Sequence, residues 1–126
     1  MGKWADGYGT LRAGDVTVGL EVAASYAART RGLLGRDGIE GAMLLTPAAS
    51  VHTFRMRFPI DVAYLDRHFG VLAVRTMVPG RLGLPRPRAR HVLEAEAGAM
   101  RRWGLRAGSR VELTGPERLR TAPRDP

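Results

Sequence analysis

The stretch from Ser50 to Asp66 reads Ser-Val-His-Thr-Phe-Arg-Met-Arg-Phe-Pro-Ile-Asp-Val-Ala-Tyr-Leu-Asp and is the most informative part of the chain. It mixes ionisable side chains with aromatic and aliphatic ones, and the ionisable ones include His52, Arg55, Arg57 and Asp61. A strand that only fills a core needs few ionisable groups, and a solvated loop needs few apolar ones. The stretch therefore predicts where a site lies, although it does not identify a reaction.

The residues after this stretch predict a hairpin and then a basic loop. Residues 61–65 and 71–78 are apolar runs that flank a turn containing Gly70, which is typical of a hairpin. Residues 79–90 are rich in Pro, Gly and Arg, and no acidic residue occurs from Arg67 through Leu93. Prolines favour an ordered loop over a strand here. This arginine loop is the best candidate for contact with an anion.

The residues before this stretch predict a second hairpin. Residues 10–12 and 16–23 are short β-prone runs around a turn, and apolar residues alternate with others along the second run. A period of two gives a strand one buried face.

A helix is expected to follow, with Ser25 as its N-cap. Tyr26, Thr30, Leu33 and Leu34 recur at the spacing of one helical stripe. We expect Arg29, Arg31 and Arg36, which lie off this stripe, to be solvated.

The remaining elements are short. Residues 42–45, 91–95 and 110–113 are strand candidates, and residues 98–103 predict a helical turn. Together the elements predict an α+β fold: a compact, mostly antiparallel, barrel-like sheet with one main helix and one short helical turn. Alternating βαβ units are missing from this pattern. We expect a loose lead-in at 1–9, a single domain at 10–114 and a flexible tail at 115–126.

Composition limits the function classes. The chain has 126 residues, of which 44% are hydrophobic, so one domain with a real core is expected. It contains no apolar run long enough to span a membrane, no apolar N-terminal segment typical of a secretory signal and no cysteine. We therefore expect a cytoplasmic protein without disulfides or thiol chemistry.

The formal charge of +8 has two explanations. An acidic partner is one, whether nucleic acid, a membrane surface or an anionic small molecule. The other is a genome rich in G and C, since Lys3 is the only lysine and the remaining positive charge is arginine.

Four segments in a fixed order carry a resemblance to a known family. They are residues 31–36, residues 51–62, residues 92–94 followed by Gly98, and residues 104–108. Together they resemble the DUF192 family of small uncharacterised bacterial and archaeal proteins. The resemblance implies a compact β-rich fold and a clustered motif, and it implies no reaction. Arg55 replaces a small or aromatic residue usual in similar sequences, and Ser109 replaces a frequent Asp.

His52 is the first candidate for chemistry. Its imidazole titrates near neutral pH and suits a general base or a metal ligand. However, His68 and His91 are far from it in sequence, and cysteines are absent. A hydrolytic zinc site needs three protein ligands, so we expect no metal and no cofactor. A structural hydrogen bond is the simpler role for His52.

Two carboxylates complete the candidate set. Asp61 lies at the start of an apolar strand, so it is expected to pair with Arg55, Arg57 or backbone amides. Glu94 either forms a carboxylate pair with Asp61 for acid–base chemistry on a glycoside, or is an exposed strand carboxylate, or is a partner for one of the arginines.

Three functional hypotheses remain open. The first is a binding domain that holds an anionic or polyhydroxylated small ligand, or an acidic protein segment. Its expected ligand-binding residues are His52, Arg55, Arg57, Asp61, Arg86 and Arg88. The second is a hydrolase-type enzyme that uses His52 with Asp61 or Glu94. The third, less favoured, is a charge-driven nucleic-acid binder.

Overall fold

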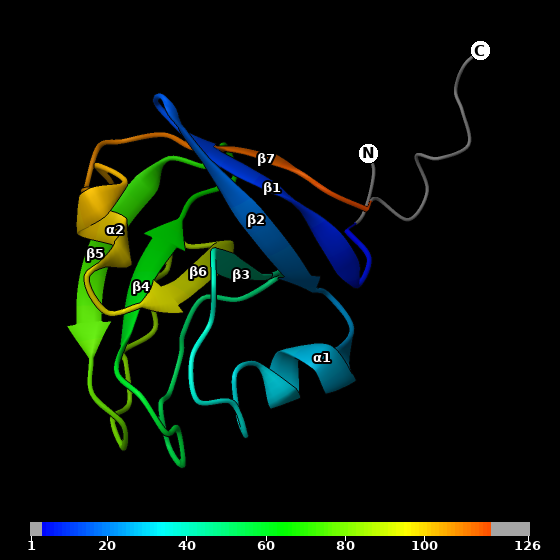
Figure 1. Cartoon of the computed structure of the whole chain (residues 1–126), viewed down its shortest axis with the longest axis vertical. Coiled ribbons are helices and arrows are strands. Elements are labelled where there is room, and N and C mark those ends of the chain that lie inside the picture. Colours follow the sequence, from blue (N-terminus) through cyan, green and yellow to red (C-terminus); the bar gives the residue numbers. More distant parts are fainter. Residues whose placement is uncertain (1–3, 117–126) are drawn as a thin grey trace.

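Seven strands form a single sheet in the computed structural model, which describes residues 4–116. The strands are β1 (Gly7–Ala13), β2 (Val16–Ala23), β3 (Ala42–Leu45), β4 (Ile60–Leu65), β5 (Val71–Met77), β6 (His91–Glu96) and β7 (Glu112–Thr114); the helices are α1 (Tyr26–Arg31) and α2 (Ala99–Arg102). The strand order is β5-β4-β6-β3-β2-β1-β7, and the sheet curls into a half barrel (Figure 1). The predicted α+β, barrel-like fold is confirmed.

One connection differs from the prediction. β2 and β3 are parallel neighbours, and α1 lies on the chain between them, so the fold contains one βαβ unit. The other paired strands of the sheet run antiparallel. The sequence predicts both strands and the helix between them, but their parallel pairing is a long-range contact that no local pattern encodes.

Both faces of the central strands are buried. Every residue of β4 is buried. Side chains alternate along a strand, so Val62 joins the apolar cluster under the long loops, while Ala63 joins the cluster that packs against α2. Two separate cores therefore lie on opposite faces of one sheet.

Asp61 is a structural residue of the α2 side. One carboxylate oxygen accepts a hydrogen bond from Thr76 Oγ1 at 2.7 Å. The other accepts from the backbone N–H groups of Gly98 at 2.9 Å and Met100 at 3.1 Å. The expected pairing with backbone amides is confirmed, and Asp61 supplies the acceptor that the first turn of α2 needs.

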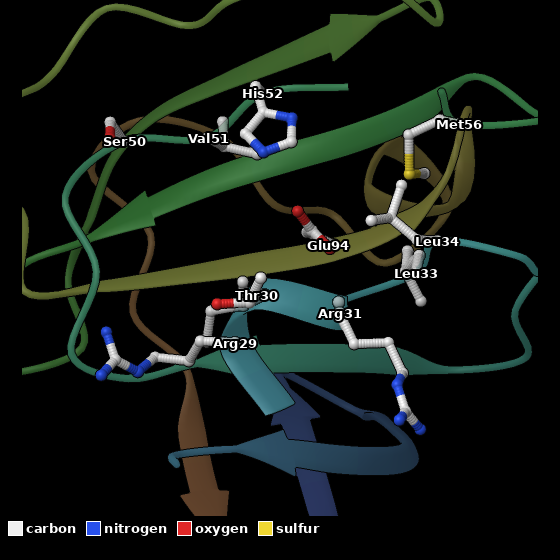
Figure 2. A pocket seen from close by; sticks show the side chains of 12 residues that line it. Arg29, Thr30, Arg31, Leu33, Leu34, Ser50, Val51, His52, Met56 and Glu94 are labelled. Atoms are coloured by element: carbon white, nitrogen blue, oxygen red, sulfur yellow. The ribbon is translucent and has the colours of Figure 1, made fainter. Parts of the chain in front are cut away.

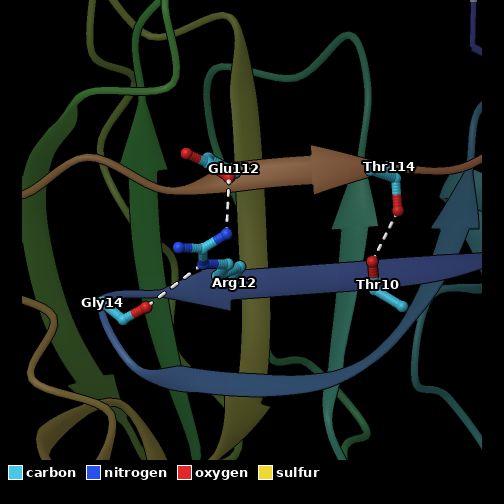
Figure 3. A network of polar contacts seen from close by, with 5 residues as sticks. All are labelled: Thr10, Arg12, Gly14, Glu112 and Thr114. Carbon is cyan, nitrogen blue, oxygen red and sulfur yellow. Dashed lines mark hydrogen bonds and ion pairs between the residues drawn. The ribbon is translucent and has the colours of Figure 1, made fainter.

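The first strand begins earlier than expected, at Gly7, within the predicted lead-in. A side chain at Gly9 would meet the carbonyl oxygen of Thr114, so this glycine lets β7 approach closely. Figure 3 shows the two contacts that join these strands, between Thr10 and Thr114 and between Arg12 and Glu112. The predicted tail from residue 117 onward, and residues 1–3 of the lead-in, lie outside the described residues.

The predicted helical stripe is wrong, although the N-cap is correct. No residue of α1 is buried, and Tyr26 is 77% exposed. The chain leaves the helix at Gly32, and Leu33 enters the core from the following turn. The Ser25 hydroxyl accepts from Ala28 N, as expected. The carboxylate of Asp6 anchors this end by accepting from the backbone N–H groups of residues 24 and 25.

We expect Asp61→Asn to lower the free energy of unfolding by about 2 kcal/mol, because the amide replaces hydrogen bonds to a charged carboxylate with weaker bonds to a neutral oxygen and forces the Thr76 hydroxyl to accept instead of donate. Urea denaturation at neutral pH measures this. The matched control is Asp37→Asn, whose exposed ion pair with Arg57 should contribute less than about 1 kcal/mol. Equal stability of the two variants would contradict the capping role.

Candidate functional site

A small pocket lies between the C-terminal end of α1 and the loop at residues 50–56, above β6 (Figure 2). Its volume is about 100 Å³. We call it the Glu94 pocket; its lining residues are Arg29, Thr30, Arg31, Gly32, Leu33, Leu34, Leu45, Ser50, Val51, His52, Met56 and Glu94. Half of these residues are apolar, and Glu94 supplies the acidic group.

Glu94 lies in the middle of this pocket (Figure 2). Its residue is 4% exposed, and burial raises the pKa of its carboxyl group to about 7. Within residues 4–116, no hydrogen bond or ion pair to this carboxyl group offsets its burial. The expectation of an exposed or arginine-paired Glu94 is wrong, because β6 is a central strand and both of its faces are covered.

Glycine at position 32 keeps the space above Glu94 open. A side-chain carbon placed on Gly32 would lie 4.0 Å from Glu94 Oε1. Gly32 also has a φ of 46°, a conformation that favours glycine. The helix end therefore passes close to the carboxyl group without a side chain between them.

His52 forms the opposite edge of the pocket. Its ring is exposed and stacks on Phe54, with ring centroids 5.0 Å apart and planes inclined by 21°. The backbone N–H of Phe54 donates to His52 Nδ1 at 3.3 Å. In the neutral imidazole this leaves the proton on Nε2, where it is free to donate.

The two arginines that line the pocket, Arg29 and Arg31, direct their guanidinium groups away from Glu94 (Figure 2). Arg29 donates to the carbonyl oxygens of Ala24 at 3.3 Å and Pro47 at 3.2 Å, so it fastens α1 to the loop after β3. The expectation of solvation fits Arg31, which is exposed, but not Arg29. It also fails for Arg36, which forms a bidentate ion pair with Glu21.

The structure does not bring Asp61 to this pocket. In the pairing of β4 with β6, Asp61 lies opposite Ala95, and Glu94 lies opposite Val62. Paired residues share a face and successive residues alternate, so the two carboxylates point to opposite sides of the sheet. The predicted carboxylate pair of Asp61 and Glu94 is therefore wrong, and His52 is likewise separated from Asp61.

The predicted arginines also lie outside the Glu94 pocket. Arg57 pairs with exposed Asp37 at 3.2 Å, and Arg55 occupies a turn with a φ of 64°. Residues 50–59 form a loop between β3 and β4. Arg86 packs over the Tyr64 ring at 4.7 Å, and Arg88 is exposed. His52 and Glu94 are the two predicted residues that line the same pocket.

Metal-binding geometry is not evident in the described part of the chain. Residues 4–116 contain no group of three His, Asp or Glu side chains arranged to hold a metal ion. His91 shares a hydrogen bond with the Thr46 hydroxyl at 2.8 Å, and burial lowers its pKa.

Within residues 4–116, no helix is long and apolar enough to cross a membrane.

Comparison with known proteins decides the family. A family model for DUF192, described as an uncharacterised ACR, matches residues 9–113. The chain belongs to the DUF192 family. A UPF0127 protein of Pyrococcus horikoshii is 33% identical to this DUF192 protein over 84 residues, which cover 63% of this chain and 73% of the relative. A UPF0127 protein of Pyrococcus abyssi is 29% identical over 98 residues, 74% of this chain and 84% of the relative.

Two solved structures share the fold of this DUF192 domain. A protein of Sinorhizobium meliloti, provisionally described as a transcription regulator, matches with a TM-score of 0.72 and 19% identity, over 88% of this chain and 95% of that one. A protein of unknown function from Novosphingobium aromaticivorans matches with a TM-score of 0.70 and 21% identity, over 89% of this chain and 92% of that one. At these identities the likeness shows the fold alone.

The sequence does not predict that the end of α1 forms one wall of the Glu94 pocket. Residues 29–34 supply half of the pocket lining, but their pattern was assigned to a buried helical stripe. The glycines at 32 and 35 were the available signal, because they end the helix and turn the chain towards β6.

The pKa of Glu94 predicts a pH-dependent stability. The folded protein holds this proton up to a pH of about 7, whereas a glutamate with the ordinary pKa of 4.5 releases it earlier. The free energy of unfolding should therefore fall as pH rises between these two values, and fall no further above them. The total loss is about 3 kcal/mol.

Glu94→Gln should remove this loss. We expect the variant to gain about 3 kcal/mol relative to the natural protein between acidic and mildly alkaline pH, as measured by urea denaturation across that range. Glu96→Gln, at the exposed end of the same strand, is the control and should show no such trend. A difference independent of pH for Glu94→Gln would contradict the raised pKa.

Proposed function

We propose that this DUF192 protein is a binding domain for a small polyhydroxylated ligand, one end of which enters the Glu94 pocket. The observation that carries the proposal is a carboxyl group at the centre of a pocket, which is buried and has no hydrogen bond to another side chain or backbone group of residues 4–116. Burial of a carboxyl group is unfavourable, and a hydrogen bond from a ligand would offset part of this cost. A ligand that supplies this hydrogen bond would bind there and stabilise the fold.

Hydroxyl groups fit this carboxyl group better than an anion does. With a pKa of about 7, Glu94 is present in both protonation states near neutral pH. A hydroxyl group donates to the carboxylate and accepts from the carboxylic acid, whereas an anion is repelled by the ionised form. The sequence predicts either an anionic or a polyhydroxylated small ligand. We therefore favour the polyhydroxylated class for the Glu94 pocket.

The pocket dimensions limit how much of the ligand enters. Sites for drug-sized ligands are roughly 300–1,000 Å³, and the Glu94 pocket has about 100 Å³. A sugar-sized molecule would therefore insert one edge and leave the remainder at the rim. There, the Nε2 proton of His52 would donate to a second hydroxyl group, while exposed Phe54 offers an apolar ring surface.

The arginines expected to bind ligand have a supporting place in this proposal. Arg55, Arg57, Arg86 and Arg88 do not line the Glu94 pocket. Their positive field would raise the local concentration of an anionic form of the ligand, such as a phosphorylated sugar. Binding should then depend on Glu94 and His52 strongly and on these arginines weakly.

Acid–base catalysis is the second candidate function. A carboxyl group whose pKa lies near the working pH is suited to proton transfer, and burial raises the pKa of Glu94 to about 7. His52 lies across the same pocket. In this alternative Glu94→Gln would abolish turnover of a bound substrate while the fold is kept. A charge-driven nucleic-acid binder would instead lose affinity steeply with salt.

A thermal-shift screen tests the binding proposal. The panel contains sugars, sugar phosphates, dicarboxylates, divalent metals and a short single-stranded oligonucleotide, at low and moderate salt. We expect a sugar or polyol to raise the melting temperature of the natural protein at both salt concentrations. The same compound should not shift Glu94→Leu, which fills the pocket centre with an apolar group.

Arg57→Ala is the matched control and should keep the shift, because Arg57 pairs with Asp37 outside the pocket. Equal shifts of all three proteins would place the ligand elsewhere. Shifts from every polyanion that disappear with salt would support binding by surface charge alone, and no shift from any compound would contradict a small ligand.

A further inference from the structure

Two neighbouring loops expose large apolar side chains at one end of the sheet. Phe54 is 46% exposed and lies in the loop before β4; Val78, Leu82 and Leu84 follow β5 and are 48%, 66% and 76% exposed. Figure 1 shows both loops projecting beyond the end of the sheet where β4 begins and β5 ends. We call residues 52–57 and 78–88 together the loop edge.

Buried Thr53 holds the two loops together as one unit. Its backbone N–H donates to Arg81 O at 2.8 Å, and its hydroxyl donates to Val78 O at 2.7 Å. The same hydroxyl accepts from Arg81 N at 2.9 Å, and Thr53 O accepts from Gly80 N at 2.7 Å. These bonds fix the backbone, so the apolar side chains stay exposed instead of folding inwards. Little ordering entropy remains to be lost on binding.

The loop edge itself carries positive charge and no acidic residue. Residues 47–60 and 67–93 contain no Asp or Glu, and the loop edge itself carries Arg55, Arg57, Arg81, Arg86 and Arg88. Of these, Arg57 forms an ion pair with Asp37 and Arg86 packs over the Tyr64 ring. Arg55, Arg81 and Arg88 are the remaining arginines, and all three are exposed. An occupant that complements this surface is therefore apolar in the middle and negative around it.

We propose that the loop edge binds an anionic phospholipid surface. Leu82 and Leu84 would enter the boundary between headgroups and acyl chains, while the arginines contact the phosphates. Leu84 lines an open hollow together with Leu72 and residues 85–88, whereas Leu82 is exposed and is not part of its lining. A peptide in that hollow would leave Leu82 uncovered, and a deformable apolar phase can cover both leucines. Projecting side chains suit insertion into a deformable apolar phase. The proposal does not depend on the function of the Glu94 pocket.

Vesicle co-sedimentation with the full chain tests the proposal. We expect binding to vesicles of phosphatidylcholine mixed with phosphatidylglycerol and little binding to phosphatidylcholine alone. Replacing both leucines, Leu82→Ser with Leu84→Ser, should weaken the partition coefficient by about tenfold or more. The matched control is Tyr8→Ser with Tyr26→Ser, which removes equally exposed apolar residues elsewhere and should leave binding unchanged.

Depth of insertion can be measured directly, because the chain contains no cysteine. A polarity-sensitive dye attached after Leu84→Cys should shift its emission to the blue when anionic vesicles are added. The same dye attached after Tyr26→Cys should not shift. Both labelled proteins must retain the natural circular dichroism spectrum, which separates loss of fold from loss of insertion.

Three outcomes would overturn the proposal. Absence of binding to anionic vesicles is the first. The second is vesicle binding that salt abolishes, that the two leucine substitutions do not weaken, and that causes no blue shift of the dye at position 84. This result would show that surface charge alone causes the binding. The third is leucine-dependent binding to polyglutamate or another acidic polypeptide without any to vesicles, which would assign the loop edge to a protein partner.

Discussion

The register between β4 and β6 is the constraint on which the rest of this structure depends. It sets Asp61 beside Ala95 and Val62 beside Glu94, so the two buried carboxyl groups of adjacent strands face opposite cores. A slip of one residue would exchange the faces of every side chain on the strand. The large buried residues on both sides, among them Tyr64 and Leu93, fix the register and therefore decide which carboxyl group meets which environment.

The two environments give the same functional group opposite roles. Asp61 has three donors within hydrogen-bonding distance and serves the architecture by capping α2. Glu94 is equally buried but faces the pocket between the end of α1 and the loop that carries His52. A carboxylate that accepts from three donors contributes to stability, whereas burial without such bonds is unfavourable and raises the pKa of Glu94 to about 7.

The sequence predicts the sheet better than the site, for physical reasons. Alternation along residues 16–23 and the apolar runs at 61–65 and 71–78 report local burial, and their strands formed as expected. Burial of Glu94 depends on β3 and β4 pairing with both edges of β6, which no local pattern encodes. The arginines near His52 suggested a single cluster, but a positive φ at Arg55 and the ion pair of Arg57 direct them elsewhere.

The backbone bridge between His52 and Leu82 has a mechanical consequence. The pocket rim and the projecting edge are neighbouring rungs of one hydrogen-bonded ladder, which continues through the bond from Gly83 N to Val51 O at 2.8 Å. A displacement of the backbone at residues 80–83 would therefore also move the backbone at residues 51–53 that carries His52. A partner that moves the loop at residues 80–83 would therefore shift the rim of the Glu94 pocket through these backbone hydrogen bonds, without any change in the sheet.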